Sequence, residues 1–346
     1  MQFVKPDVNI NFIGKRKIAF TVSAVMILIS IVSLAFKGGP RLGIDFQGGT
    51  LIQVKFLAPV EIDGIKTGLQ NINLGQSSVQ GFGELEAHEY LIRTDSSVMT
   101  SEEFTADIKK ALAASTGSEV EIRRVEMVGP QVGRDLREKA LFAMFYALLF
   151  ITIYISGRFE LKWAISGIMA AALIGAVYVL TLINVSIPWL IIGALVVTLM
   201  LFWFLELKYA MGAIVALLHD VTITVGLFSI FDKEFTLAII AALLTIIGYS
   251  LNDTIIVFDR IRENLRKYHK KSLEVILNRS INETLSRTIL TSLTTLFVVV
   301  TLFVLGGGII HDFAFALIVG VAVGTYSSVF VASPILLAWQ AKQARK

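Results

Sequence analysis

Runs of apolar residues long enough to cross a lipid bilayer dominate this sequence. A spanning helix needs about 20 mostly apolar residues, because every backbone polar group must be paired inside the hydrocarbon. We identify eight such segments, at 18–36, 140–157, 163–184, 187–205, 209–231, 236–258, 286–305 and 313–338. They predict a polytopic α-helical membrane protein of about eight spans, whose bundle occupies residues 140–338 after a first helix at 18–36.

The first apolar run follows the basic residues Lys15, Arg16 and Lys17. It is longer than the roughly 7 to 15 apolar residues of a signal peptide, and no small-residue cleavage site follows it. We therefore expect an uncleaved anchor. The chain has no cysteine, which excludes disulfides and thiolate metal sites. Its net charge of +4 is no signal for nucleic acid, because Lys and Arg stand where membrane topology needs them.

Lys and Arg gather in the short loops that follow even-numbered spans, above all in the loop predicted at 259–285. The opposite loops, at 184–187, 232–234 and 306–312, hold a single lysine. Because cytoplasmic loops carry the excess of positive charge, we expect both termini, 1–17 and 339–346, in the cytoplasm. Segment 37–139 then lies outside the cytoplasm, which is the periplasm in a bacterium with two membranes.

Segment 37–139 has the composition of a soluble domain. Its patterns predict strands at 50–57, 77–82, 88–94 and 119–128, and helices at 61–72 and 100–117. The order βαββαβ is that of a ferredoxin-like α+β domain, with an unrelated small α+β domain as the alternative.

An internal repeat is visible in the membrane half. The sequence "ELKWAISGIMA" at 160–170 matches "ELKYAMGAIVA" at 206–216, a shift of 46 positions. The match predicts a duplicated helical hairpin, at about 147–174 and 193–220. Chance similarity between two apolar hairpins is the alternative.

Several polar side chains stand inside predicted spans, where an ionisable group costs about 2.5 to 3.5 kcal/mol and is a functional candidate by default. His219 and Asp220 lie midway along one span, and Asp253 lies six residues from the end of the next. Arg287 begins the span after that. Polar neighbours of Asp253 and Arg287 are Ser250, Asn252, Thr254 and Thr291.

Each of these groups also has a structural interpretation. His219 and Asp220 would be a hydrogen-bonding pair that holds helices together, Asp253 would reach the interface, and Arg287 would be an interfacial anchor. The functional interpretation joins them. Burial favours a neutral carboxyl and a nearby Arg favours the carboxylate, so a pair that meets and parts would take up and release a proton. An intramembrane aspartyl protease would need Asp220 and Asp253 to share a proton at close range.

Five stretches together carry a family resemblance: "FIGKRK" (12–17), "GIDFQGGT" (43–50), "GAIVALLHD" (212–220), "GYSLNDTIIVFDRIREN" (248–264) and "ETLSRTILTSLTTL" (283–296). The chain resembles the SecD/SecF family of bacterial protein export, and within it the SecF branch. This family is similar in architecture to the resistance-nodulation-division (RND) transporters.

The resemblance implies a non-enzymatic accessory subunit without a cofactor in the inner membrane of a bacterium. Such a subunit works with SecD beside the SecYEG channel and uses the proton motive force to promote preprotein translocation. Asp253 matches the family's proton-linked Asp and Arg287 its important Arg, while Asp220 matches a polar His-Asp pair. The motif residues Gly43, Asp45, Gly48 and Gly49 would stand where the first helix enters the outer domain, as a structural turn or a substrate contact.

The chain departs from the family in its number of spans, since SecF proteins ordinarily have six. The surplus is one hairpin, coinciding with the repeat, and two extra crossings leave the topology of all later residues unchanged. A proton-coupled RND-type exporter subunit for small solutes is the alternative function. Such exporters usually have about twelve spans, so this chain would need to act as an oligomer or with a partner.

Overall fold

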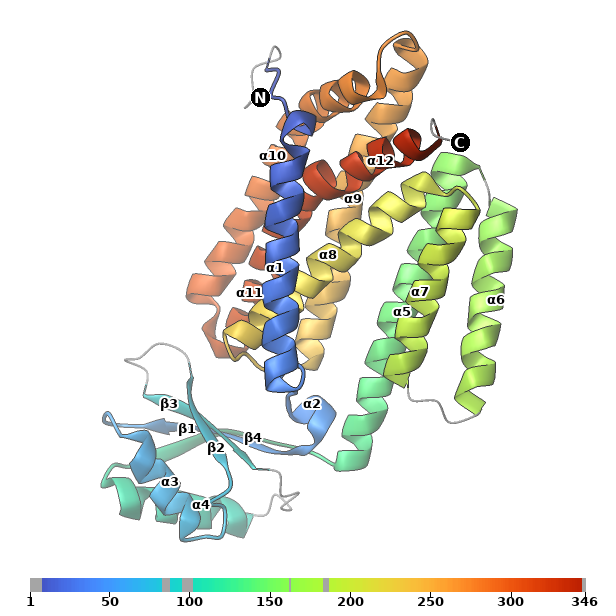
Figure 1. The fold of residues 1–346 in the computed structure, drawn as a ribbon. Coiled ribbons are helices and arrows are strands. Elements are labelled where there is room, and N and C mark those ends of the chain that lie inside the picture. Colours follow the sequence, from blue (N-terminus) through green and yellow to red (C-terminus); the bar gives the residue numbers. More distant parts are fainter. Residues whose placement is uncertain (1–7, 83–87, 95–101, 162, 183–186, 344–346) are drawn as a thin grey trace.

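The computed structural model describes residues 8–82, 88–94, 102–161, 163–182 and 187–343. It consists of a helical bundle with a small α+β domain at one end (Figure 1). We call the end of the bundle beside this domain the outer end, and the opposite end the inner end. The predicted fold class is confirmed. Parts of the predicted tails, 1–7 and 344–346, lie outside the described residues.

The α+β domain contains a four-stranded sheet of β1 (Gly49–Phe56), β2 (Ser78–Phe82), β3 (Glu89–Thr94) and β4 (Val120–Val128). The strand order is β2-β3-β1-β4, and each neighbouring pair is antiparallel. Its helices are α3 (Ile62–Gln70) and α4 (Glu102–Thr116), which lie on one face of the sheet (Figure 1). This is the ferredoxin-like arrangement that the order βαββαβ predicted. Alternate β1 residues Ile52, Val54 and Phe56 point into its core, which shows period-two burial.

The bundle contains α1 (Arg16–Lys37), α5 (Pro130–Glu160), α6 (Trp163–Leu182), α7 (Ile187–Phe204), α8 (Lys208–Ile230), α9 (Leu237–Lys267), α10 (Leu273–Leu305), α11 (Gly307–Ser327) and α12 (Ser333–Gln343). A 3-10 turn (Ile13–Lys15) precedes α1, the short helix α2 (Ile44–Gln47) precedes β1, and a π-helix (Ser328–Ala332) joins α11 to α12. Within the described residues, seven helical stretches are long and apolar enough to cross a membrane. The remaining predicted span, at 187–205, corresponds to α7, whose stretch Trp189–Phe204 is apolar but shorter.

Small residues let the helices of the bundle approach closely. A Cβ atom added to Gly226 of α8 would lie 2.1 Å from the Cβ of Ser30 on α1. On α11, a Cβ atom added to Gly324 would lie 2.9 Å from the Cβ of Ser250 on α9. In lipid the hydrophobic effect does not drive helices together, so close van der Waals packing of this kind stabilises their association. It fixes α1 against α8 and α9 against α11, around the polar groups described below.

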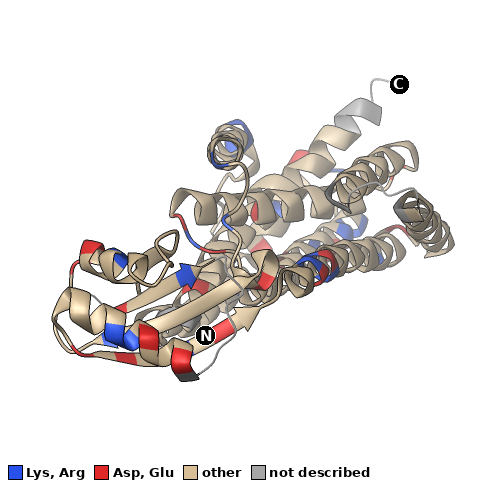
Figure 2. Cartoon of the chain, turned by 90° about the horizontal axis from the view of Figure 1, so that it is seen from below, with Lys and Arg blue, Asp and Glu red and all other residues tan. Residues whose placement is uncertain are grey.

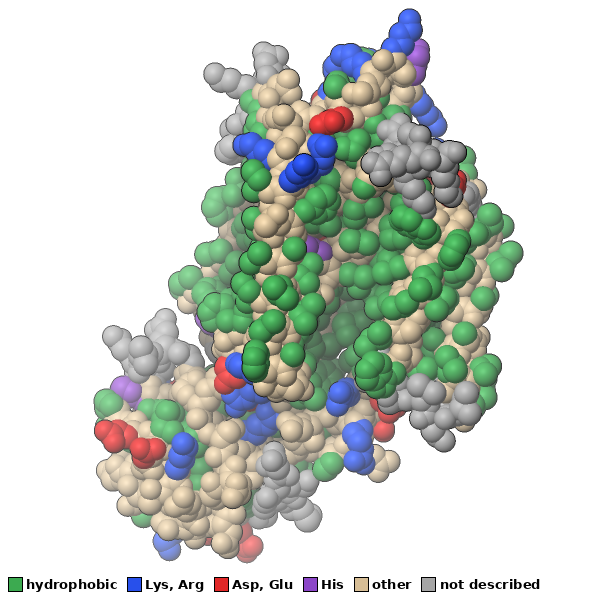
Figure 3. All heavy atoms as spheres, viewed as in Figure 1, with side chains coloured by type: hydrophobic (Ala, Val, Ile, Leu, Met, Phe, Trp, Pro, Cys, Tyr) green, Lys and Arg blue, Asp and Glu red, His purple; other side chains and the backbone are tan. Residues whose placement is uncertain are grey.

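Charge is found mainly at the two ends of the bundle. The visible side is mostly hydrophobic, with Lys and Arg gathered at the inner end and near the α+β domain (Figure 3). Charged residues of both signs are spread over the α+β domain itself (Figure 2). The 31 residues of α9 span about 46 Å, more than the roughly 30 Å of bilayer hydrocarbon. Most of the loop predicted at 259–285 is therefore helical, as extensions of α9 and α10.

Helices α6 and α7, which connect the two copies of the repeated sequence, form a hairpin at the edge of the bundle. Helices α6 and α7 lie on the outside in Figure 1, while α5 still contacts α8 directly. In the two Glu-Leu-Lys segments, the left-handed residue is Leu161 (φ 55°) after α5 and Glu206 (φ 57°) after α7, so it falls one repeat position earlier in the second copy. Glu160 of the first turn accepts a hydrogen bond from the Tyr209 backbone N–H at 2.9 Å, so the two turns are adjacent. Helices α6 and α7 thus lie between α5 and α8 in the chain, although α5 and α8 contact each other.

Candidate functional site

Asp220 of α8 is fully buried and is bonded to three other side chains. Its Oδ1 lies 2.8 Å from Nδ1 of His219, and its Oδ2 accepts hydrogen bonds from Ser250 of α9 (2.6 Å) and Ser327 of α11 (2.8 Å). Small hydroxyl residues reach it because α9 and α11 pack closely at Gly324. The Asp220 carboxyl is thus a junction between three helices.

The network continues from His219 to the first helix. His219 Nε2 lies 3.1 Å from the Ser23 hydroxyl of α1, and Ser23 bonds Tyr326 of α11 at 3.2 Å. Tyr326 in turn donates to the Ala19 carbonyl at 2.7 Å. Sequence reasoning missed Ser23, Tyr326 and Ser327. The signal was present for Tyr326 and Ser327, which are polar residues inside the last predicted span.

A π-helix begins directly after Ser327. In the segment Ser328–Ala332 the backbone takes one extra residue per turn, and the Ser333 hydroxyl donates to the Ser328 carbonyl five residues earlier at 2.9 Å. Single π turns inside α-helices are frequent at functional sites. Here the turn ends the straight part of α11 beside the Asp220 network.

Asp253 of α9 forms a second polar centre. Its side chain is 1% exposed, and its Oδ2 has no hydrogen-bond partner among the described residues. Asp253 lies three residues after Ser250, and therefore on the same side of α9. An unpaired buried acceptor costs on the order of 1–3 kcal/mol, and more when it is charged. Asp253 is therefore a group held in an unfavourable environment.

Arg287 of α10 acts electrostatically on Asp253 but forms no ion pair with it in the described structure. Its side chain is exposed on the surface of the bundle. The next residue, Thr288, is buried, and its hydroxyl also lacks a described partner. The two residues predicted to interact are thus brought near each other without direct contact.

The supporting residues divide between the two centres. Ser250 belongs to the Asp220 network, while Thr254 is buried next to Asp253. Asn252 is exposed, so it does not join either centre. Thr291 bonds its own helix, through the carbonyls of residues 287 (3.1 Å) and 288 (3.0 Å).

Asp220 and Asp253 form no hydrogen bond with each other in the described structure. The Asp220 carboxyl is engaged by His219, Ser250 and Ser327, and Asp253 contributes nothing to that set. An aspartyl protease needs two carboxyl groups that share one proton. This arrangement gives no support to a protease.

The motif "GIDFQGGT" connects the outer domain to the start of α9. The Gly43 N–H donates to the Phe235 carbonyl at 2.9 Å, and the Phe235 N–H donates to the Arg41 carbonyl at 2.7 Å. Asp45 accepts a hydrogen bond from the Leu237 N–H at 2.9 Å. A Cβ atom at Gly43 would lie 2.9 Å from Cγ2 of Thr236, so only glycine allows this approach.

Of the two later glycines of the motif, Gly48 contacts α5. Gly48 and Gly49 have φ values of 81° and 115°, which favour glycine. A Cβ atom at Gly48 would lie 2.8 Å from Cα of Pro130, and one at Gly133 would lie 3.0 Å from the Gly48 nitrogen. The motif is therefore a structural junction between the starts of α5 and α9, in agreement with its interpretation as a turn.

Ion pairs surround this junction at the outer end. Asp232 lies 3.3 Å from Lys37 and 3.1 Å from Arg41, and Arg93 of the sheet lies 3.2 Å from Glu234. The hydrogen bond from Lys37, with the nearby charge of Arg41, lowers the pKa of Asp232 below its ordinary value. The exposed pairs of Asp232 contribute little singly, whereas Arg93 is buried, and all of these pairs join the α8–α9 connection to α1 or to the outer domain.

Two family models match this sequence. The model "Protein export membrane protein SecD/SecF, C-terminal" matches residues 108–197 and again residues 171–342. The model "SecD/SecF GG Motif" matches residues 32–60, which include the junction at Gly43 to Gly49. The first model aligns twice, with an overlap at 171–197 inside the hairpin.

Named relatives match the chain over nearly its whole length. The Protein translocase subunit SecF of Magnetococcus marinus is 43% identical in an alignment of 352 positions that covers 100% of this chain and 97% of the relative. The protein of the same name from Calditerrivibrio nitroreducens is 41% identical over 340 residues, covering 97% of this chain and 96% of the relative.

Solved structures of SecDF proteins share the fold. SecDF from Thermus thermophilus, titled a translocon-associated membrane protein, superimposes with a TM-score of 0.69 at 30% identity. The match covers 97% of this chain but only 39% of that one, so the chain spans about two fifths of the solved SecDF polypeptide. SecDF in a super-membrane-facing form gives a TM-score of 0.62 at 31% identity. The chain is an integral membrane protein and belongs to the SecF branch of the SecD/SecF family of protein-export membrane proteins.

Proposed function

We propose that this chain works with a SecD partner beside the SecYEG channel and uses the proton gradient across the inner membrane to promote preprotein translocation. Asp253 carries this proposal. It is a buried carboxyl with one unpaired oxygen, and a cation on the adjacent helix acts on it from beyond ion-pair distance. The role is not enzymatic and requires no cofactor, because the gradient supplies the energy.

The geometry around Asp253 suits a group that alternates between two states. Protonation removes the charge and with it most of the cost of burial, while a closer approach of Arg287 favours the carboxylate. Each proton that crosses a potential of 100 mV carries about 2.3 kcal/mol, enough to bias a conformational step by a factor of tens. We assign proton uptake to Asp253 and its release to contact with Arg287.

Movement of α9 reaches the outer domain through the junction described above. Asp253 lies 16 residues after Leu237, or about 24 Å along the helix. The start of α9 is bonded to Asp45 and Gly43, and these residues lead directly into β1. A displacement of α9 that accompanies protonation would therefore be passed to the domain that faces the emerging preprotein.

The Asp220 network holds the helices against which α9 moves. His219 and Asp220 connect α1, α8, α9 and α11, and Ser250 attaches α9 to this frame only one turn from Asp253. We propose His219 and Asp220 as the second part of the relay, with Ser250 as the contact between the two centres.

The test compares Asp253→Asn with unmodified protein in vesicles that contain SecD, the SecYEG channel and the ATP-driven motor. We expect Asp253→Asn to abolish the stimulation of preprotein translocation by an imposed proton gradient. Translocation driven by ATP alone should continue at the unmodified rate. A sodium gradient of equal size, applied separately, identifies the coupling ion.

Thr245→Ala is the matched control, because Thr245 is exposed on the same helix and bonds only the Ala241 carbonyl of its own helix. It should retain full stimulation. If Asp253→Asn inserts normally and still responds fully to the gradient, the proposed role of Asp253 is wrong.

A further inference from the structure

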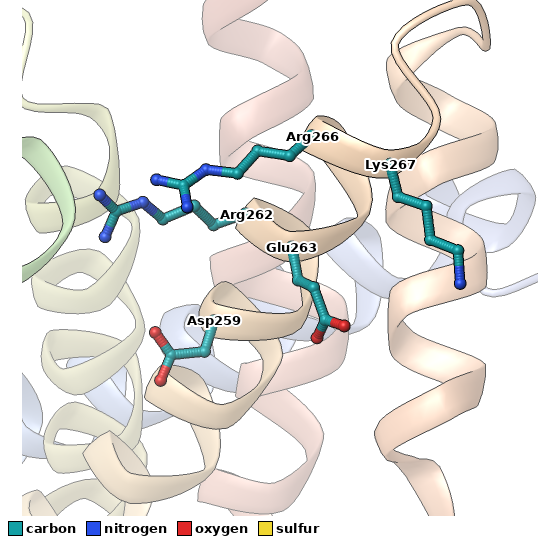
Figure 4. A pocket seen from close by; sticks show the side chains of 5 residues that line it. All are labelled: Asp259, Arg262, Glu263, Arg266 and Lys267. Atoms are coloured by element: carbon teal, nitrogen blue, oxygen red, sulfur yellow. The ribbon is translucent and has the colours of Figure 1, made fainter.

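A shallow depression of about 640 Å³ lies on α9 near its inner end (Figure 4). Five charged side chains line it: Asp259, Arg262, Glu263, Arg266 and Lys267. In Figure 4, Arg262 and Arg266 extend side by side in one direction, while Glu263 and Lys267 point to another side of the helix. The depression therefore presents two guanidinium groups together.

Both carboxylates of the depression are already paired with other arginines. Asp259 lies 2.6 Å from Arg158 of α5, and Glu263 lies 2.8 Å from Arg260. They therefore have little capacity left to compensate further cations.

Arg262 and Arg266 form no ion pair within the described part of the chain. Arg262 donates one hydrogen bond to the Arg158 carbonyl at 2.9 Å, which leaves most of its five donors unused. Like charges four residues apart on a helix repel each other. An anion between two such groups removes the repulsion and accepts charge-assisted hydrogen bonds from both.

A third cation, Lys208, lies near the same position. Its Nζ stands 5.5 Å from the centre of the Tyr209 ring. Among the described residues Lys208 also forms no ion pair. Lys208 thus adds a cation from α8 beside the two guanidinium groups of α9, while Glu160, bonded to the Tyr209 N–H, is a carboxylate in the same region.

An apolar pocket of about 110 Å³ adjoins these cations. Lys208 and Tyr209 line it together with Ile261, Leu265 and Trp339. Ile261 and Leu265 directly precede Arg262 and Arg266, so the charged depression and the apolar pocket share adjoining faces of α9. The site therefore combines positive charge with a hydrophobic surface.

Along α9 the site lies beyond the length that the hydrocarbon of a bilayer would cover. Arg262 and Arg266 lie 25 and 29 residues after Leu237, about 38 and 44 Å along the helix. A bilayer is about 30 Å thick in its hydrocarbon and 40–45 Å with headgroups. Trp339 and Trp203 pack together at 5.0 Å in this region, as expected of interfacial aromatic residues.

We propose that Arg262, Arg266 and Lys208 bind the phosphate of an anionic phospholipid of the inner leaflet, with the apolar part of the lipid against Ile261, Leu265 and Trp339. Basic pockets at the cytoplasmic ends of membrane helices recognise such headgroups. The lipid supplies the negative charge that the depression lacks, and its acyl region matches the adjoining pocket.

The test uses fluorescence quenching by brominated lipids in nanodiscs. Trp163, Trp189 and Trp203 are replaced by Phe, which leaves Trp339 as the single reporter. Brominated phosphatidylglycerol and brominated phosphatidylcholine are compared at equal mole fraction. We expect phosphatidylglycerol to quench Trp339 at least threefold more than its mole fraction predicts, and phosphatidylcholine to quench it in proportion. Inorganic phosphate at 10 mM should not reverse the preference; reversal would identify free phosphate as the ligand and overturn the lipid assignment.

Arg262→Gln/Arg266→Gln should reduce quenching by phosphatidylglycerol to the level of phosphatidylcholine. The matched control is Arg279→Gln, because Arg279 is at the same end of the bundle but is paired with Glu283 at 2.8 Å. This control should keep the preference. Equal quenching by the two lipids in the unmodified reporter protein, or an unchanged preference in the double variant, would show that the site does not select anionic lipid.

Discussion

The Asp45 carboxylate accepts a hydrogen bond from the Leu237 backbone N–H at 2.9 Å, across 192 positions of sequence. Leu237 is the first residue of α9, and the N-cap residue Thr236 provides no side-chain cap of its own. Asp45 therefore caps α9 from another element, where a negative charge also complements the helix dipole. The entry to the outer domain is bonded in this way to the helix that carries Asp253.

Asp45→Ala should loosen the start of α9. Loss of a capping side chain costs about 1 kcal/mol, while Asn keeps an acceptor of similar reach. We expect amide hydrogen exchange at Leu237 to Ile239 to be roughly fivefold faster in Asp45→Ala, with Asp45→Asn close to the unmodified protein. Stimulation of translocation by the proton gradient should likewise be weaker in Asp45→Ala and close to that of the unmodified protein in Asp45→Asn. Identical exchange in all three proteins would rule out the capping role.

Gly226→Val should separate α1 from α8. A Cβ atom at this position would lie 2.1 Å from the Cβ of Ser30, so one helix must move. We expect a lower Tm in detergent, by several degrees. Gly248→Ala is the control, because nothing lies within 4 Å of a Cβ atom there. It should keep or slightly raise the Tm, since Ala is about 0.5–1 kcal/mol better than Gly in a helix. A Gly226→Val protein as stable as the control would contradict the close packing.

Asp220 and Asp253 should differ in their effect on stability. Asp220→Ala removes the acceptor of Ser250 and Ser327, and each buried group left unpaired costs about 1–3 kcal/mol. Asp253→Ala removes an Oδ2 atom that has no hydrogen-bond partner among the described residues. Thermal unfolding should therefore show a large loss of stability for Asp220→Ala and little change for Asp253→Ala. Equal losses would show that Asp253 is also a structural group.

Attachment of α1 to the α8–α9 connection should weaken in acid. The pKa of Asp232 is lowered in the folded protein by the hydrogen bond from Lys37 and the charge of Arg41. The stabilisation is therefore complete above the ordinary pKa of 3.8 and is lost as the pH falls below it through the lowered value. Hydrogen exchange around residue 232 should accelerate below pH 4, and Asp232→Asn should remove this pH dependence. An Asn variant with the same acid response would place its origin in another carboxylate.

Deletion of residues 161–206 should leave a folded bundle. The deletion joins Glu160 to Leu207 and restores one Glu-Leu-Lys turn, because the two copies are in register at a shift of 46. The ends are already close, since Glu160 bonds the Tyr209 N–H at 2.9 Å. We expect normal insertion, an intact outer domain and retained gradient-dependent translocation with SecD. Failure of the deleted protein to insert would mean that α6–α7 is required for the fold.

The elements of the ferredoxin-like domain could be predicted almost completely, because they are short and regularly patterned. Strand β1 begins at Gly49 where 50 was expected, and β4 ends at Val128 as expected. The ends of membrane helices were less accessible to sequence reasoning. Hydropathy identifies the part of a helix that lies in lipid, but α9 continues to Lys267 because charged residues prolong a helix as readily as apolar ones.

The candidate site was predicted in its ionisable residues but not in its geometry. The free-energy cost of burying an ionisable side chain identifies Asp220 and Asp253 as candidates from this sequence alone. It cannot show that the Asp220 carboxyl binds Ser327, 107 positions away, or that Asn252 faces outward while Asp253 faces inward. Nor could it show that Asp45 caps α9, because that contact depends on how two separate elements meet in space.

The π-helix at Ser328–Ala332 also sets the rotation of the chain that follows it. One additional residue in a helix turns everything after it by about 100°. Ser327, before the turn, faces the Asp220 carboxyl, and Trp339, after it, lines the pocket at the inner end. Removal of a single residue within this turn would keep the first contact and rotate the second away. The extra residue of the π-helix thus rotates the later side chains about the helix axis, so that one continuous helix contacts two differently oriented surfaces.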